Sequence, residues 1–245
     1  MQDSTTAPAP PGLSEQAAAL GAPLDDSQLH QLARLVSMLL ETNRQMNLTA
    51  VRDPDEAWSR HVLDSLSLAP ELAALPQGAA VVDVGAGGGF PGLVLAISRP
   101  DLRFVLVDAT GKKVRYLARA AEALGLRHVR AVQGRAEELA SGGKQAGEHR
   151  ERYAMAVCRA LAPMPVLLEL VSPFVQPGGR VLAIKGERAE AELRASTEAL
   201  ERLHLRLEGT RRTPTGTIVT LTKTGPTPGR YPRRSGEPKR APIGG

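Results

Sequence analysis

Hydrophobic residues recur at helical spacing near the start of the chain. Leucine or valine occupies positions 29, 32, 35, 36, 39 and 40, which predicts an amphipathic helix that ends near Arg44. A second helix is expected to start at Asp53-Pro54, because an acidic N-cap followed by proline favours a helix start. We therefore expect a helical segment over residues 25–75, preceded by a disordered extension over residues 1–24.

Short apolar blocks alternate with helical patterns from residue 80 onward. They predict strands at residues 81–84, 104–107, 129–133, 154–157, 180–184, 205–208 and 217–222, and helices at 92–98, 112–124, 136–139, 166–171 and 187–203. This alternation predicts an α/β fold with a seven-stranded, mostly parallel sheet and helices on both faces. The last two strands are expected to close the sheet as an antiparallel pair. We assign residues 76–224 to this domain and residues 225–245 to a basic tail rich in proline and glycine.

The composition restricts the class of protein. With 245 residues, of which 42% are hydrophobic, the chain can bury one full-sized core. Its single cysteine, Cys158, excludes an internal disulfide and a cysteine-based zinc site, and the five histidines do not cluster, so no metal is expected. No apolar run reaches the length of a membrane span. We expect a cytoplasmic protein without membrane contact, taken as a monomer.

The positive charge is concentrated at the C-terminal end. The net charge is +5, and residues 211–245 carry eight Lys or Arg against one acid, Glu237. Such a segment is either a solubilising tail or an arm that contacts a phosphate backbone. Composition leaves both interpretations open.

The stretch VVDVGAGGGFPG, residues 81–92, has the pattern of a buried strand followed by a turn rich in glycine. Such turns let the backbone approach a nucleotide-like ligand closely. A dinucleotide pattern can be read at Gly87, Gly89 and Gly92, so NAD competes with S-adenosylmethionine. Asp83 inside the strand, the crowding of glycines from Gly85, and the closing strand pair favour S-adenosylmethionine.

Further polar residues follow the next strands. Asp108 ends the second strand and Glu137 follows the third, at the carboxyl ends where α/β sheets bind ligands. For Glu137 the alternative is an ordinary helix start. Cys158 and Arg159 end the fourth strand, where the methyl acceptor is expected. A thiol there could attack a cytosine ring, but lone cysteines are more often small buried hydrophobes.

The signatures of other acceptors are missing from the sequence. Cys158 follows valine rather than the proline usual in cytosine-C5 enzymes, and the Asn-Pro-Pro-aromatic signature of exocyclic-amine methylation is absent. Guanine N7 fits as an acceptor, because its lone pair needs no proton removed and catalysis is then mainly positioning.

Several short motifs together resemble one family. They are Asn47-Leu48-Thr49, residues 60–65 (RHVLDS), Asp83-Val84-Gly85, Gly89-Phe90-Pro91-Gly92, Arg135-Ala136-Glu137, Arg159-Ala160, Lys185-Gly186 and residues 231–236 (YPRRSG). On these motifs the chain resembles the RsmG (GidB) family, bacterial 16S rRNA guanine-N7 methyltransferases. The match extends over roughly residues 40–240.

The resemblance implies a class I S-adenosylmethionine-dependent methyltransferase fold, Rossmann-like, with an N-terminal helical extension. It implies a cofactor pocket formed by Gly85, Gly87, Phe90, Asp108, Ala109, Ala136, Glu137 and Arg159. It also implies that Arg159 and Lys185 position the acceptor, and that Arg60, His61, Arg233 and Arg234 hold RNA phosphates. The sequence departs from the family at Cys158 and Ala109, where relatives usually have serine.

The implied substrate is N7 of a single guanine in the decoding-region loop of 16S rRNA. The partner is then the rRNA, the 30S subunit or its assembly intermediate. Two alternatives stay open: a non-catalytic rRNA-binding or nucleotide-sensing factor with the same fold, and an NAD-dependent oxidoreductase.

Overall fold

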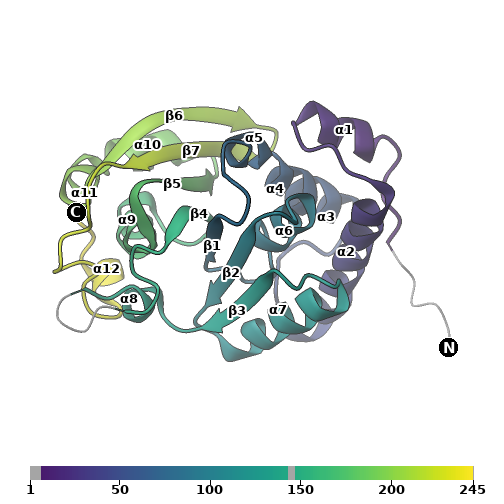
Figure 1. Ribbon diagram of the computed structural model, residues 1–245, viewed down its shortest axis with the longest axis horizontal. Coiled ribbons are helices and arrows are strands. Elements are labelled where there is room, and N and C mark those ends of the chain that lie inside the picture. Colours follow the sequence, from purple (N-terminus) through teal and green to yellow (C-terminus); the bar gives the residue numbers. More distant parts are fainter. Residues whose placement is uncertain (1–6, 143–146, 245) are drawn as a thin grey trace.

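One mixed sheet organises the molecule. The computed structural model describes residues 7–142 and 147–244, and within them the sheet has seven strands in the order β3-β2-β1-β4-β5-β7-β6 (Figure 1). The strands are β1 (Ala80–Val84), β2 (Arg103–Asp108), β3 (Val129–Gln133), β4 (Tyr153–Arg159), β5 (Val175–Lys185), β6 (Leu205–Thr213) and β7 (Gly216–Lys223). The predicted seven-stranded α/β fold is confirmed.

Only β7 runs against the direction of the other six strands of this sheet. Strands β1 to β5 are parallel to one another, whereas β7 is antiparallel to both β5 and β6. The strand order reverses between β1 and β4, and in open α/β sheets ligands bind beyond the carboxyl ends of the strands at such a point. The glycine turn follows β1, so the topology places it at this position.

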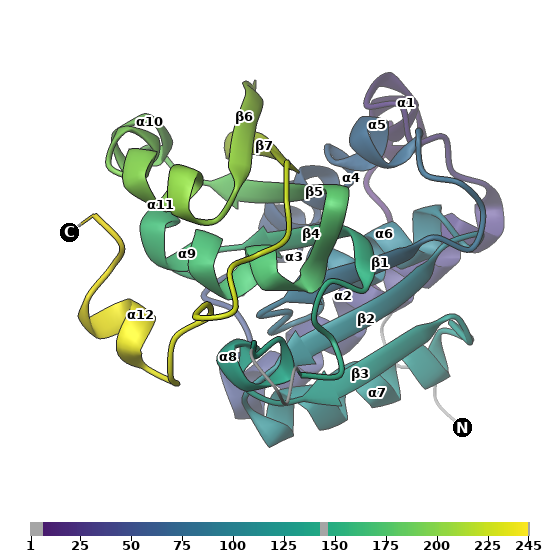
Figure 2. The ribbon, with the colours of Figure 1, turned by 60° about the vertical axis from the view of Figure 1, so that its left-hand side comes forward.

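Alternate residues of each strand pack against different helices. In β1, Val81 belongs to the core shared with α2 (Asp26–Met46), α6 (Gly92–Ser98) and α7 (Gly111–Ala123). Its neighbour Val82 belongs to a second core with α8 (Ala136–Leu139), α9 (Met164–Val171) and α11 (Thr197–Arg202). Because strand side chains alternate between faces, helices cover both faces of the sheet (Figures 1 and 2).

The predicted N-terminal helices are present. Helix α2 begins with a capping box between Asp25 and Gln28, which satisfies two free amides of the first turn. Asp53 caps the second helical stretch, accepting from the Glu56 amide at 2.9 Å. That stretch comprises α3 (Pro54–Ala57), a π-helical turn η1 (Trp58–Leu63) and α4 (Asp64–Leu66), and α5 (Ala69–Leu72) follows.

The predicted disorder of residues 1–24 is wrong for part of that range. Residues 13–19 form helix α1 (Leu13–Ala19), and Leu13 and Ala17 are buried in the same core as α2. These two side chains lie four positions apart, so they share one face of the helix and bury it together. Residues 1–6 lie outside the described residues.

The predicted single helix over residues 187–203 is also wrong. The structure has two short helices, α10 (Ala189–Arg194) and α11, separated at Ala195 and Ser196. Ser196 is fully buried, and its hydroxyl donates to the Glu192 carbonyl at 2.7 Å. A serine that bonds back to the preceding turn disfavours helix continuation, which explains the break.

Residues 225–244 form a C-terminal strap rather than a free tail. The strap runs along α8 and α9 and contains α12 (Glu237–Arg240) (Figure 2). Tyr231 and Ile243 are only 3% and 4% exposed, and both belong to the core on the α9 face. Burial of these two side chains explains why a segment rich in proline and glycine is ordered.

Within residues 7–142 and 147–244, none of the helices combines the length and apolarity that crossing a membrane requires. In the same ranges no group of three acidic, histidine or cysteine side chains is arranged to hold a metal ion.

We expect Leu13→Ala to lower the free energy of unfolding by about 2–4 kcal/mol, because it leaves a cavity in the core. Leu207→Ala is the matched control, since Leu207 is 39% exposed and should change stability by less than about 0.5 kcal/mol. Urea unfolding of both variants measures the difference. Equal stabilities would mean that α1 does not pack on the domain.

Candidate cofactor and RNA site

The glycine turn is tied to the end of the neighbouring strand. The amides of Gly85 and Ala86 both donate to the Val107 carbonyl, at 2.8 and 2.9 Å. Gly85, Gly87 and Gly89 have φ values of 77°, 54° and 93°, a region that residues with a Cβ rarely adopt. The turn therefore needs glycine at these positions, and it projects its backbone beyond the sheet.

Two buried carboxyl groups support this turn. Asp83 Oδ2 accepts from the Gly92 amide at 2.8 Å, at the start of α6. Asp108 accepts from the Gly87 amide at 3.1 Å and from the Thr110 amide at 2.7 Å. Asp83 is fully buried, and this burial raises its pKa to about 7.

The predicted adenosine side of the pocket lies at the ends of β2 and β3. Ala109 is exposed directly after β2, and Ala136 is the half-buried first residue of α8. Glu137 follows it and is 9% exposed. One carboxylate oxygen of Glu137 accepts from the Gly236 amide of the strap at 2.9 Å.

Phe90, His61 and Arg159 form a compact stack above the glycine turn. The rings of His61 and Phe90 are stacked, with centroids 4.8 Å apart. The Arg159 guanidinium lies 5.8 Å from the Phe90 centroid, and its Nη2 lies 2.8 Å from His61 Nδ1. Arg159 also bonds to the Arg60 carbonyl and pairs with Asp64 at 3.4 Å. The structure thus brings Phe90 and Arg159 together, as predicted.

Lys185 anchors a loop instead of pointing freely at an acceptor. Its Nζ donates to the Ala162 carbonyl at 2.7 Å and pairs with Glu192 at 2.7 Å. This loop, residues 160–163, carries Leu161, whose side chain lies against Gly85: a Cβ on Gly85 would be 2.5 Å from Leu161 Cδ1. Lys185 therefore holds in place the loop whose Leu161 side chain packs against the glycine turn.

Comparison with known proteins decides the family. Residues 28–213 match the family described as GidB, rRNA small subunit methyltransferase G. The chain belongs to the GidB family. An rRNA small subunit methyltransferase G of Sorangium cellulosum (strain So ce56) is 44% identical over 225 residues, with 92% of each chain covered. That of Moorella thermoacetica (strain ATCC 39073 / JCM 9320) is 39% identical over 232 residues, covering 91% of this chain and 93% of the relative.

A solved structure confirms the fold. A SAM-dependent methyltransferase of Aquifex aeolicus superposes with a TM-score of 0.53 at 16% identity, covering 73% of this chain and 97% of that one. The fold is therefore that of class I S-adenosylmethionine-dependent methyltransferases. As a GidB-family member, the chain belongs among the enzymes that methylate small-subunit rRNA with S-adenosylmethionine.

The glycine turn fits this cofactor. Asp83 Oδ1 is buried and has no hydrogen-bond partner among the described residues. At Gly87 the nearest atom to an added Cβ is the Gly85 carbonyl oxygen, at 3.7 Å, so the backbone is open to a ligand. The carboxylates of Asp108 and Glu137 are acceptors suited to the hydroxyl and amino groups of an adenosine.

His61 does not suit the predicted role of holding RNA phosphates. It is 6% exposed, and its two ring nitrogens contact Thr49 at 2.9 Å and Arg159 at 2.8 Å. Burial, together with the nearby Arg159 charge, lowers the pKa of His61 to about 4. The ring is therefore neutral near pH 7 and supplies no positive charge to a phosphate.

The predicted RNA arginines differ in their surroundings. Arg60 is exposed and pairs with Glu56 one helical turn earlier, at 2.8 Å. Arg234 is exposed as well. Arg233 instead pairs with Glu169, a fully buried side chain on α9, at 2.6 Å, so its charge is already neutralised inside the fold. This pairing disfavours a contact between Arg233 and an RNA phosphate, and the RNA-binding role of Arg233 stays a prediction.

Cys158 does not suit the role of a nucleophile. The side chain is fully buried in the core on the α9 face, and its sulfur contacts the Leu182 carbonyl at 3.8 Å. Burial raises the pKa of the thiol well above its usual range, so the reactive thiolate is disfavoured. The interpretation as a small buried hydrophobe is confirmed.

Sequence reasoning missed the connection from Asp64 to the closing hairpin. Asp64 is 5% exposed, and it accepts from the Thr215 hydroxyl at the β6–β7 turn while also pairing with Arg159. Leu161 was missed too. The one signal for Asp64 was its place in the family motif of residues 60–65. Its partners Arg159 and Thr215 are 95 and 151 positions away in sequence, so no local pattern connects them to it.

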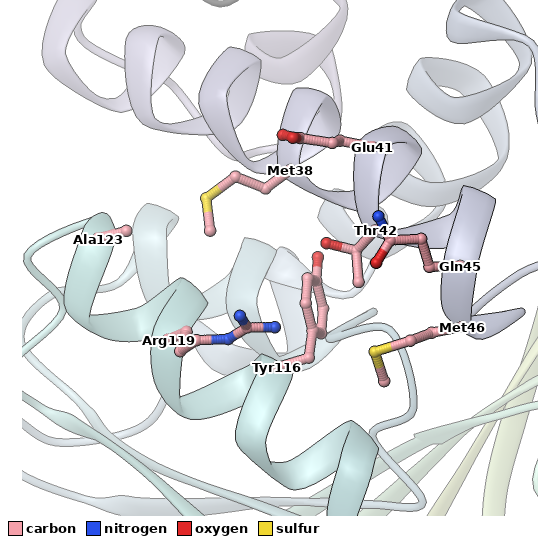
Figure 3. Close-up of a pocket in the computed structure, with 8 residues that line it drawn as sticks. All are labelled: Met38, Glu41, Thr42, Gln45, Met46, Tyr116, Arg119 and Ala123. Atoms are coloured by element: carbon pink, nitrogen blue, oxygen red, sulfur yellow. The ribbon is translucent and has the colours of Figure 1, made fainter.

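A cleft lies between α2 and α7. It consists of two adjoining hollows of about 340 and 600 Å³ that share Gln45, Met46 and Arg119. Figure 3 shows Tyr116 between the two helices with its hydroxyl toward Thr42 and Gln45. The cations along the cleft are Lys112, Arg115 and Arg119, on the helix that starts three residues after Asp108.

We expect His61 to make the protein sensitive to acid. Because its pKa falls from 6.5 to about 4 on folding, its stabilising contribution is complete above pH 6.5 and is lost as the pH falls through 4. The shift corresponds to about 3 kcal/mol. His61→Gln should lose less free energy of unfolding over this window, measured by urea unfolding at pH 7 and 4. If wild type and His61→Gln lost the same free energy of unfolding between pH 7 and 4, His61 would not be a neutral, buried residue.

Proposed function

We propose that this GidB-family chain transfers a methyl group from S-adenosylmethionine to N7 of one guanine in the decoding-region loop of 16S rRNA. The observation that carries the choice of N7 is the chemistry at the end of β4. Among the described residues there, Cys158 is buried and both nitrogens of His61 are engaged. Asp64 is held by Arg159 and Thr215. This arrangement supports an acceptor that needs neither a nucleophile nor a base.

The residues of the chain would then act by positioning. When bound, the cofactor supplies an electrophilic methyl group on a sulfonium. The backbone of Gly85 and Gly87 and the carboxylates of Asp108 and Glu137 would hold it at the edge of the sheet. Arg159, fixed against Phe90, would orient the base, and Lys185 would act through the loop that it anchors. Correct orientation alone can contribute many powers of ten to a rate.

Exposed cations around this edge would hold the RNA backbone. Arg60 and Arg234 are exposed and are the candidates that we keep from the sequence. His61 is buried and Arg233 is already paired with Glu169, which makes both less suited to this role. The cations of the α2–α7 cleft add a row on one face of α7, at spacings of three and four residues. Such a row suits phosphates, whose binding depends on charge and falls with salt.

The decisive experiment maps the modified nucleotide. Purified protein, labelled S-adenosylmethionine and unmethylated 16S rRNA or 30S particles are incubated, and the labelled position is identified. We expect one guanine labelled at N7. Binding of rRNA without transfer would favour the non-catalytic alternative, and transfer to another atom would overturn the N7 assignment.

We expect Gly87→Asp to abolish cofactor binding. The new carboxylate would stand beside Asp108 at a position with φ of 54°, which adds repulsion and strain where the backbone should meet the ligand. Gly125→Asp is the matched control, because Gly125 also has a positive φ of 71° but lies at the far end of α7. Calorimetric titration with S-adenosylhomocysteine checks both. Unchanged affinity in Gly87→Asp would refute this pocket.

We expect the double variant Arg115→Gln, Arg119→Gln to bind rRNA more weakly and with a shallower salt dependence, the slope of log K against log salt falling by about 2. Cofactor affinity should not change. Arg127→Gln, an exposed residue beyond the C-terminal end of α7, serves as the control. Filter binding over a salt series gives the slopes. Equal slopes of log K against log salt for wild type and the double variant would exclude the cleft as a binding site for the RNA backbone.

A further inference from the structure

The C-terminal strap is fastened to the domain by a buried ion pair. Arg233 donates through Nε and Nη2 to the Glu169 carboxylate, with distances of 2.6 to 3.2 Å, and its backbone amide donates to the same group at 2.8 Å. Glu169 is 0% exposed. Arg233 Nη2 also donates to the Ala241 carbonyl at 2.8 Å, so one side chain links the middle of the strap and its C-terminal part to α9.

A second arginine fastens the strap to the end of α8. Arg150 Nη1 donates to the Ala140 carbonyl at 2.9 Å and to the Tyr231 carbonyl at 2.8 Å. Its Nη2 reaches the Thr227 carbonyl at 2.6 Å. Since Ala140 is the C-cap residue of α8, the short helix that carries Glu137 is held to the strap at its C-terminal end.

The strap also contacts Glu137 at the other end of α8. The Gly236 amide donates to Glu137 Oε1 at 2.9 Å, three residues after Arg233. Gly236 has φ of 84°, a conformation that glycine adopts at low cost. A charge-assisted hydrogen bond of this kind fixes the direction of the carboxylate. Removing the Arg233 anchor would release the turn that supplies this amide.

We propose that the strap positions Glu137 for the adenosine part of the cofactor, with Arg233 as the positioning residue. This inference rests on the proposed cofactor pocket. It gives Arg233 a part in cofactor affinity, where the sequence had indicated RNA binding. If the strap were purely structural, loss of the Arg233 anchor would lower stability alone. If the strap positions Glu137, the same loss also weakens ligand binding, and it does so only while Glu137 is present.

The test compares neighbouring arginines that differ in their surroundings. Arg233→Gln removes the buried ion pair, and Arg234→Gln removes an exposed charge one position later. We expect the first to weaken binding of S-adenosylhomocysteine on the order of tenfold, as loss of a hydrogen bond to a charged group does. The second should leave the affinity for S-adenosylhomocysteine, measured without RNA, within about twofold of wild type. In turnover, Arg233→Gln should raise KM for S-adenosylmethionine and leave kcat at saturation unchanged.

A double-mutant cycle with Glu137→Ala shows whether Arg233 acts through Glu137. We expect Arg233→Gln to have no further effect on S-adenosylhomocysteine affinity in the Glu137→Ala background. If Arg233→Gln does not fold, Arg233→Lys, which keeps the charge without the planar fork, is measured in the same cycle and should show a smaller effect of the same kind.

The outcomes separate the two proposals. Wild-type protein that does not bind S-adenosylhomocysteine refutes the cofactor pocket itself. If wild type binds, equal affinity in the Arg233 variants overturns the positioning role. An Arg233 effect that persists in full without Glu137 overturns it too. Calorimetry on the full-length chain at one temperature and salt concentration provides every value.

Discussion

The bond between the Asp83 carboxyl and the Gly92 amide is the contact on which the site depends. It joins the end of β1 to the first turn of α6, and the backbone between them must then form the glycine turn. Close approach makes glycine necessary at position 92, since an added Cβ would lie 2.7 Å from Asp83 Oδ2 and would overlap Leu106. Burial of Asp83 is the cost of this junction, seen in its raised pKa.

Much of the fold was predictable because its signals are local. Strand β3 and helices α6 and α8 have the bounds that the sequence indicated, since apolar periodicity, glycine and proline act within a few residues. The divided helix at Ser196 was missed for a physical reason. Its burial and its bond to Glu192 decide the break, and burial is a property of the tertiary structure.

The part of the candidate site that the sequence predicts consists of residues whose place near a strand end can be recognised from the local pattern. Asp83 is the last but one residue of β1 and Asp108 is the last residue of β2, so the parallel pairing of these strands brings them to the same edge of the sheet. For His61, the family motif indicated contact with RNA phosphates and carried no information about burial or charge. The stack on Phe90 and the bond to Arg159, 98 positions away, make it buried and neutral instead. No periodicity within a helix could reveal that pairing.

The charges of the basic C-terminal segment, residues 211–245, likewise cannot be interpreted from the sequence alone. Four of its eight cations are used in ion pairs with acids of the domain: Arg211 with Glu71, Arg212 with Glu190, Lys223 with Glu151 and Arg233 with Glu169. The other four, Arg230, Arg234, Lys239 and Arg240, are exposed on the strap. A charge count treats both groups alike. Yet Lys223 is itself buried and Arg233 pairs with the buried Glu169, so these two cations hold the segment to the domain. The pair of Arg212 with Glu190 is exposed and adds little to stability. The second group is exposed and could contact a phosphate, so this segment offers less free positive charge to RNA than its composition implies.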